Sequence, residues 1–515
     1  MNYEISKMKK PLITLLLLSV LIRLPAINQS LWLDEAIQAW STTFSINELL
    51  FGYINGDFNP PLLHLIHQFL TIFVEPTEFI MRLPSLLSGV GVTWLTWRFL
   101  SKFINDKPTL ILGTLLNTTA PLLMFYSQEA RMYMPATFFA MWSMVSFWEI
   151  TTVKTNKTQK QISIIFSKPY LEYFCATGAM MLTHYMTWFL LPTQFLFAIL
   201  VPHTQKELQL TRYAVLQNLF QSLKLFLPLL FWLILISPIL LSQLQVGSSA
   251  ATDLPVWQSL SSFSLKQLAL IPTKILIGRI PIDLNLQTTL LIATPLTLWL
   301  GTILLALKKS LQHSNTNYKQ HVQSLLFLIL WLTIPIIIAI IVSTKLSIFS
   351  YFRFLYITPA FYLLLIIAIA KLTSSHKILS MKYWVLGTYL AINIITSSLY
   401  LFNPSNHRED WKGLVNYLNQ TDRSPYVIIL SSVDRPFWYY DQNDHIMIDY
   451  PQAKSYTDQP GIWLIKYAQP IFEPDNKTEN DLLNNYGYTV AQEKHFRGDI
   501  VVKYLLKDGF LQAKN

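Results

Sequence analysis

Long apolar runs recur along most of the chain and are separated by short polar segments. A helix needs about 20 residues to cross the hydrocarbon core of a bilayer. The pattern therefore predicts a mainly α-helical, polytopic membrane protein with about 11 transmembrane helices, although several runs are short or contain polar residues. The predicted spans are residues 11–27, 80–100, 108–126, 133–151, 169–186, 187–203, 223–244, 286–307, 323–343, 353–371 and 382–402.

The segment between the first two spans, residues 28–81, predicts two helices that lie on the membrane rather than cross it. Residues 30–40 have the character of an interfacial helix, because Trp32 and Trp40 suit the headgroup level. A second apolar helix begins near Pro61, which fits a first helical position, and it is too short to span. The two helices would form a shelf that roofs a cavity between the spans.

The chain changes character after residue 402. Charge density rises, and short β-like runs alternate with helical patterns. We predict domains of residues 1–402, a transmembrane catalytic domain, and 403–515, a small α/β domain. The aromatic run 437–440 is either core or a surface for sugar stacking. The predicted strands are 426–430, 446–450, 461–467 and 499–505, and the predicted helices are 411–418 and 480–486.

Charge fixes the predicted orientation. Only 13% of the residues are charged, about half the fraction of an ordinary soluble chain, and the formal net charge is +10. Cytoplasmic loops should hold the Lys and Arg residues, which puts the N-terminus inside and both 28–81 and 403–515 outside the cytoplasm. The predicted inner segments, each with three or four basic residues, are 1–10, 98–107, 152–168, 203–224, 308–322 and 371–382.

Single residues add detail. The first run resembles a secretory signal, but no A-x-A site follows, so we expect an uncleaved helix with Arg23 snorkelling to the outer interface. Cys175 is the only cysteine, which excludes an intrachain disulfide, and we expect it to be a small buried residue.

The sequence has no D-x-D, P-loop, G-x-G-x-x-G, G-x-S-x-G or H-E-x-x-H motif. Its basic residues are dispersed along the chain, which argues against binding of nucleic acid.

The loop 28–81 contains six acidic residues and no Lys or Arg. Asp34 and Glu35 could simply be favourable charges at a helix N-terminus. They could equally pair with another loop or do chemistry, because adjacent carboxylates can have separated pKa values that leave one as an ionised base. The acidic residues are Asp34, Glu35, Glu48, Asp57, Glu75 and Glu78.

Four motifs in order resemble a known family. Together they are similar to the bacterial branch of the protein-mannosyltransferase-like, C-class (GT-C) glycosyltransferases, which includes the aminoarabinose transferases of lipid A. The resemblance is sharp over about 20–200 and continues more weakly to the tail, at 351–354 and 408–411. The motifs are Leu33-Asp34-Glu35-Ala36, Asn59-Pro60-Pro61-Leu62, Met81-Arg82-Leu83-Pro84-Ser85 and Tyr126-Ser127-Gln128-Glu129-Ala130-Arg131-Met132-Tyr133.

The resemblance implies a polyprenyl-phosphate sugar donor used on the outer side of the membrane. Asp34 matches the family's catalytic acid and would act as general base, with Glu35 in support. Arg353 matches a basic position near the lipid phosphate, and Glu129 and Arg131 lie where the family lines its cavity. Displacing a phosphate requires a cation to hold its charge and a base to activate the acceptor, which agrees with these roles.

Several of these residues have simpler interpretations. Arg353 and Arg82, a further candidate for the donor phosphate, could be snorkelling charges at helix ends. Glu129 and Arg131 could form a structural pair. The candidates for the cavity and acceptor are Asp57, His64, His184 and Tyr185, and His64 departs from the aromatic residue usual in the family.

The sequence thus predicts an inverting hexosyl- or pentosyltransferase in a bacterial-type cell membrane, with a lipid, glycan or protein acceptor. A multi-pass transporter is one alternative, but the polar residues gather at the outer interface, and Glu149 and Glu172 near inner span ends can snorkel. A lipid-linked glycan ligase or polymerase is the other. No cofactor is indicated, and no ligand spacing decides whether a divalent metal binds.

Overall fold

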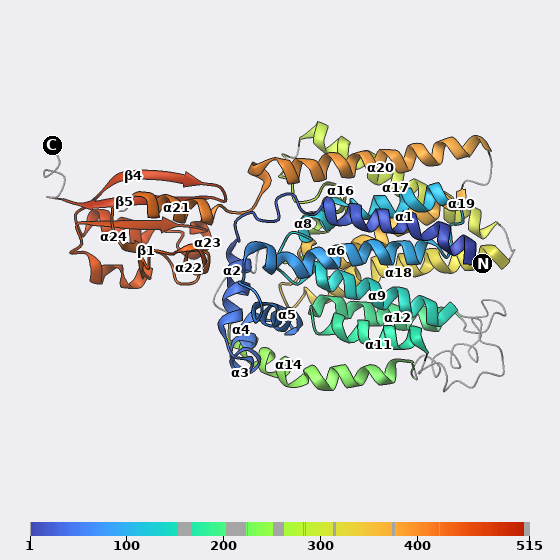
Figure 1. Ribbon diagram of the computed structural model, residues 1–515, viewed down its shortest axis with the longest axis horizontal. Coiled ribbons are helices and arrows are strands. Elements are labelled where there is room, and N and C mark those ends of the chain that lie inside the picture. The colour runs from blue at the N-terminus through green and yellow to red at the C-terminus, as the bar shows by residue number, and fades with distance from the viewer. Residues whose placement is uncertain are drawn as a thin grey trace. The chain divides into compact units, whose positions relative to one another are not determined.

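The computed structural model describes residues 2–152, 167–201, 223, 225–250, 262–281, 283, 285–312, 316–372, 376–421 and 423–508 (Figure 1). They form two compact units. The helical unit comprises Met1–Pro25, Ile46–Ile66 and Arg82–Asn403, and the sheet unit comprises Ala26–Ser45, His67–Met81 and Pro404–Asn515. The loop 28–81 is thus divided between the units. The predicted inner segments at 152–168 and 203–224 lie almost wholly outside the described residues.

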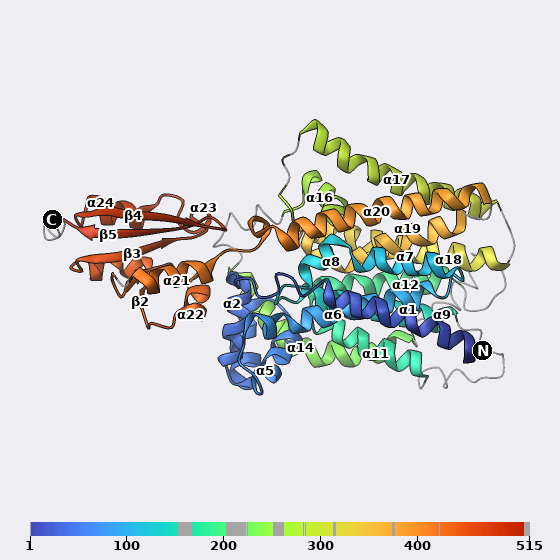
Figure 2. The ribbon, with the colours of Figure 1, turned by 45° about the horizontal axis from the view of Figure 1, so that its top comes forward.

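A helix lies at each of the eleven predicted spans, and the long helices of the helical unit run in a common direction (Figures 1 and 2). The longer helix α16 lies outside the predicted spans. The helices are α1 (Asn2–Leu21), α6 (Glu78–Leu100), α7 (Lys107–Thr118), α8 (Pro121–Tyr126), α9 (Tyr133–Thr152), α11 (Lys168–Met181), α12 (Leu190–Leu200), α14 (Leu230–Ala250), α16 (Leu265–Ile277), α17 (Leu286–Leu311), α18 (Thr316–Val342), α19 (Thr358–Leu372) and α20 (His376–Phe402).

Five helical segments of the described residues are long and apolar enough to cross a membrane. Others fall short for a local reason. The predicted span 108–126, for example, is split into α7 and α8, because Pro121 lacks an N–H and begins a new helix. The number eleven therefore stays a prediction. The five are Glu78–Leu100, Leu286–Ser310, Val322–Val342, Tyr351–Leu372 and Lys382–Phe402.

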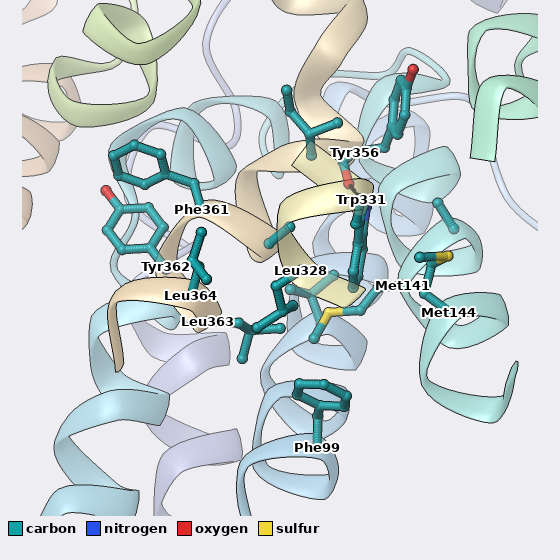
Figure 3. Close-up of a cluster of buried hydrophobic side chains, with 14 of the residues drawn as sticks. Phe99, Met141, Met144, Leu328, Trp331, Tyr356, Phe361, Tyr362, Leu363 and Leu364 are labelled. Carbon is teal, nitrogen blue, oxygen red and sulfur yellow. Dashed lines mark hydrogen bonds between the residues drawn. The ribbon is translucent and has the colours of Figure 1, made fainter. Parts of the chain in front are cut away.

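The core of the helical unit is built around α19, which is buried almost throughout (Figure 3). A helix that is apolar on all sides is expected to be surrounded by others. It packs against α7, α17 and α18. On α18 the buried Trp331 donates its indole N–H to the Tyr356 carbonyl at 3.1 Å, which ties that helix to the turn before α19.

We predicted that the acidic residues Glu149 on α9 and Glu172 on α11 snorkel. Instead, both form ion pairs within the helical unit. The Arg98 guanidinium on α6 lies 2.5 Å from a Glu149 oxygen and 2.6 Å from a Glu172 oxygen. Lys102 adds a contact of 2.7 Å to Glu149. These side chains are less than a third exposed, so the cluster is a structural connection between three helices.

We expect Arg98→Gln to destabilise the helical unit by about 3 kcal/mol, because it leaves two carboxylates without their shared cation. Thermal unfolding in detergent would measure the change. Lys168→Gln is the matched control, since that side chain is 88% exposed and 4.0 Å from Glu172. An exposed pair of this kind contributes little, so equal melting temperatures for the two variants would contradict the prediction.

The sheet unit contains a five-stranded mixed sheet of order β2-β1-β3-β5-β4. Strand β1 pairs in parallel with β2 and β3, whereas β5 pairs antiparallel with β3 and β4. Four strands match predicted runs, and β4 was missed. The strands are β1 (Tyr426–Ile428), β2 (Ile446–Ile448), β3 (Gly461–Lys466), β4 (Tyr488–Phe496) and β5 (Ile500–Lys507).

Alternating residues of β3 reach two separate cores, as the period of two in a strand requires. Ile462 and Leu464 pack on the side that includes Leu482 of α24 (Lys477–Asn484). Trp463 and Ile465 pack on the side that includes α21 (Trp411–Thr421). Leu33 of the loop 28–81 also lies in this second core, alongside Phe437 of α22 (Arg435–Tyr440). Phe437 is thus core, the simpler of its two interpretations.

Two predictions about single residues are wrong. Cys175 is exposed on α11, where an apolar thiol can face lipid as readily as protein. Arg23 is fully buried rather than snorkelling, because backbone and hydroxyl oxygens satisfy its guanidinium. It donates to Ser127 Oγ at 3.0 Å, to the Ser19 carbonyl at 3.0 Å and to the Thr118 carbonyl at 3.0 Å.

Candidate active site

Helix α4 (Ile54–Asp57) ends in a largely buried carboxylate, that of Asp57. Phe58, the next residue, has φ of 57°, a left-handed conformation that is uncommon for a residue with a side chain. Asn59 Nδ2 donates to Asp57 Oδ2 at 3.0 Å, and His64 Nε2 lies 3.2 Å from the same oxygen. His64 belongs to α5 (Leu62–Thr71), so the turn and the helix are joined through this carboxylate.

Gln243 of α14 fixes the same turn. Its side-chain NH₂ donates to the Ile54 carbonyl at 2.8 Å and to the Asn59 carbonyl at 3.0 Å. Its amide oxygen accepts from the Tyr185 hydroxyl at 2.5 Å. Tyr185, which begins η3 (Tyr185–Phe189), therefore acts on the Asp57 turn through Gln243, a residue that the sequence did not single out.

The loop 127–132, between α8 and α9, is buried along its whole length. Arg23 and Gln128 hold its beginning, since the Gln128 NH₂ donates to the Arg23 carbonyl at 2.9 Å. A Cβ at Gly89 of α6 would lie 2.4 Å from Ser127 Oγ and 2.5 Å from Arg23 Nε, so only glycine lets the arginine pass. This packing positions Arg131 and Glu129, which are 8% and 2% exposed.

Arg131, Arg353 and His184 lie close enough to act on one another electrostatically. Burial lowers the pKa of His184, in the turn after α11, and the positive charges of Arg353 and Arg131 lower it further, to about 3. This imidazole is therefore neutral at physiological pH. Burial alone would raise the pKa of Asp57, but the hydrogen bond and charge of His64, the charge of Arg131 and the Asn59 hydrogen bond together hold it below its ordinary value.

The rings of Tyr133, His184 and Phe352 pack together in this site. The Tyr133 ring lies 5.7 Å from the His184 ring and 5.5 Å from the Phe352 ring, each edge to face. Arg353 follows Phe352 in η5 (Tyr351–Ile357), and its guanidinium carbon lies 5.9 Å from that ring. Its Nη1 donates to the Ser347 carbonyl at 3.3 Å. The position of Arg353 in η5 thus sets where its guanidinium lies, and the residue remains partly exposed.

Two cations, Lys274 on α16 and Arg279 in the turn after it, were missed by the sequence analysis. The Arg279 guanidinium carbon lies 5.1 Å from the Phe125 ring of α8, and Lys274 donates to the Ile280 carbonyl at 2.9 Å. Burial, with the nearby Arg279 charge, lowers the pKa of Lys274 to about 8. Helix α16 packs against both α8 and η5. The available signal was that the predicted outer loop 245–285 holds three basic residues, against the positive-inside bias.

Asp34 and Glu35 lie in the sheet unit, on α2 (Leu33–Trp40). Glu35 is fully buried and accepts from the Trp32 backbone N–H at 3.4 Å, closing the first turn of the helix. Asp34 remains partly exposed. The pKa of Tyr467 is raised by burial, by the charge and hydrogen bond of Glu409 and by the charge of Asp34, so Asp34 lies near that tyrosine.

The helical unit therefore brings together Asp57, His64, Arg131, His184 and Arg353, with Tyr185 acting through Gln243. Arg82 is buried on α6, one turn before Ser85, whose hydroxyl donates to the Arg131 carbonyl at 3.4 Å. Asp34 and Glu35 lie in the sheet unit. Across the described ranges, no group of three or more His, Cys, Asp or Glu side chains could hold a metal ion.

Comparison with solved structures identifies the fold. The crystal structure of ArnT from Cupriavidus metallidurans bound to undecaprenyl phosphate matches 96% of this chain and 97% of that chain, with a TM-score of 0.55 and 11% identity. The apo state of that protein matches 97% of this chain and 98% of that chain, with a TM-score of 0.51 and 10% identity. Archaeal oligosaccharyltransferase AglB from Archaeoglobus fulgidus, in complex with an inhibitory peptide and a dolichol-phosphate, matches 88% of this chain and 69% of that chain, with a TM-score of 0.50 and 10% identity.

The chain therefore has the fold of the aminoarabinose-transferase-like, C-class glycosyltransferases, as the sequence motifs predicted. At these identities the likeness shows the fold alone. No protein-family model matches the chain, and no curated protein matches its sequence.

Proposed function

We propose that the protein is a membrane glycosyltransferase that moves a sugar from a polyprenyl-phosphate donor to a lipid, glycan or protein acceptor on the extracytoplasmic face. Asp34 is the general base of an inverting displacement, and Glu35 supports it. Arg353 and Arg131 bind the donor phosphate, with Arg82 and Glu129 beside them. The cavity for the acceptor includes Asp57, His64, His184 and Tyr185.

One observation carries the proposal: the positive charges of Arg131 and Arg353 both act on His184, in a fold shared with a structure that holds undecaprenyl phosphate. Two guanidinium groups beside an imidazole that adds no charge suit a leaving phosphate, whose oxygens a planar fork can bind in pairs. Lys274 on α16, which packs against η5, and Arg279 just after that helix offer further positive charge.

The proposal is tested by incubating the purified protein with a panel of polyprenyl-phosphate sugars, hexoses and pentoses, and measuring release of free polyprenyl phosphate. One donor should lose its sugar when the correct acceptor is present. The same assay with and without EDTA decides whether a divalent metal is needed. Transport of a solute into proteoliposomes, with no donor in the panel consumed, would favour the transporter alternative.

The likeness to AglB supports a second candidate, a ligase that transfers a lipid-linked glycan instead of a single sugar. The two candidates differ in the donor, so lipid-linked oligosaccharides belong in the panel. The ligase is expected to use outer-loop Arg and His residues rather than the acidic first loop. Loss of activity in Asp34→Asn therefore favours the first candidate.

We also propose eleven spans, with the N-terminus in the cytoplasm and the domain 403–515 outside. In a Cys175→Ser background, single cysteines at positions 34, 57, 260 and 450 should react with an impermeant reagent from outside, and those at 157 and 315 only after permeabilisation. A cytoplasmic position 450 would contradict the charge argument and the site built on it.

A further inference from the structure

Two arginines of the C-terminal segment bracket the helix that carries Asp34. The Arg408 guanidinium carbon lies 4.1 Å from the centre of the Trp32 ring, directly before α2. The Arg435 guanidinium carbon lies 4.0 Å from the centre of the Trp40 ring, the last residue of α2. Each end of this eight-residue helix is thus covered by a cation–π contact within the sheet unit.

Other contacts hold the same segment without involving a carboxylate of α2. The Leu31 N–H donates to the Tyr440 hydroxyl at 2.8 Å, and the Lys412 N–H donates to Ser30 Oγ at 3.2 Å. Leu33 is buried in the core that contains Trp411. A helix of eight residues has little stability of its own, so these tertiary contacts decide where it lies.

Arg408 itself is held in place by the turn between β4 and β5. The Arg497 Nε donates to the Arg408 carbonyl at 2.6 Å, and the Asp410 N–H donates to the Arg497 carbonyl at 3.0 Å. Gly498, with φ of 88°, lets this turn lie against Glu409, since a Cβ there would lie 2.3 Å from Glu409 Cγ. The turn between β4 and β5 thus fixes the backbone of Arg408, whose guanidinium contacts the Trp32 ring.

We infer that Arg408 and Arg435 are positioning residues that hold α2, and with it Asp34, in the geometry that the transfer requires. The expected effect on turnover rests on the proposed function of Asp34, whereas the expected effect on the position of α2 does not. A base displaced by about 1 Å can cost about 100-fold in rate, so weakening either stack should lower turnover without removing a group that binds donor.

The test compares Arg408→Gln, Arg435→Gln and the double variant with Arg423→Gln. Arg423 is the matched control, because its guanidinium carbon lies 5.4 Å from the centre of the Tyr504 ring in the same sheet unit. Two readouts are needed: kcat and KM for the donor, and hydrogen exchange of the backbone amides of residues 33–40. Melting temperature identifies any variant that fails to fold, and Arg408→Lys, which keeps the cation, then replaces Arg408→Gln.

We expect each single glutamine variant to lower kcat by about 10- to 100-fold with KM for the donor unchanged, and to speed exchange in α2, whereas Arg423→Gln changes neither. Unchanged exchange in the double variant would overturn the positioning role. Faster exchange with unchanged kcat would overturn its link to catalysis. If the wild-type protein transfers no sugar, the proposed function fails, and the exchange data alone decide whether the arginines position α2.

Discussion

Asp34→Asn should lower turnover by about 10²- to 10⁴-fold, the usual contribution of general-base assistance. An acceptor hydroxyl is a poor nucleophile while it keeps its proton. A carboxylate within hydrogen-bond reach can take that proton as the bond to the anomeric carbon forms. Asparagine keeps the shape of the side chain and removes only the base, so KM for the donor should stay within about twofold while kcat falls.

Two further variants sharpen this result. Glu35→Gln should cost less than Asp34→Asn, because Glu35 is buried and bound to the Trp32 backbone at the start of the helix. Glu48→Gln, at an exposed acid of the same loop, should leave turnover unchanged. A folded Asp34→Asn protein that binds donor and turns over at the wild-type rate would exclude Asp34 as the base, and Glu35 and Glu129 would be examined next.

Much of the fold was predictable because apolar runs report directly on helices that must be buried or face lipid. Strand β4 was missed for the opposite reason. It is an edge strand, most of its residues are exposed, and residues 492–495 are all polar, so no alternation marks it. The short helix α22 was missed because six residues carry too little periodicity to recognise.

The candidate site divides in the same way. The sequence named Arg131, His184 and Arg353 as candidates because they stand at the ends of apolar runs, and Arg131 also lies within a motif that resembles a family. Arg23 was given the wrong role and Gln243 was not found, because their roles depend on partners about 60 to 190 residues away in the chain. A sequence shows that a polar residue lies near a membrane span, but not which distant carbonyl it will meet.

Arg353→Ala should raise KM for the donor by about 10- to 100-fold, the effect of losing a charge-assisted hydrogen bond. Arg353 lies in η5, and its hydrogen bond to the Ser347 carbonyl is long, at 3.3 Å, so the loss of this side chain should affect folding little. Arg353→Lys should recover part of the affinity, because the charge remains and the planar fork is lost.

Lys345→Ala provides the control for Arg353→Ala, since it removes an exposed positive charge from the segment just before η5. A general loss of attraction for an anionic lipid would affect both variants and would fade at high salt. A specific phosphate contact would affect Arg353→Ala alone and persist at high salt, because a desolvated cation is poorly screened. Donor titrations at two salt concentrations separate these outcomes. An Arg353→Ala protein with wild-type KM would remove Arg353 from the donor site and leave Arg131, which acts on the same imidazole, as the cation that holds the phosphate.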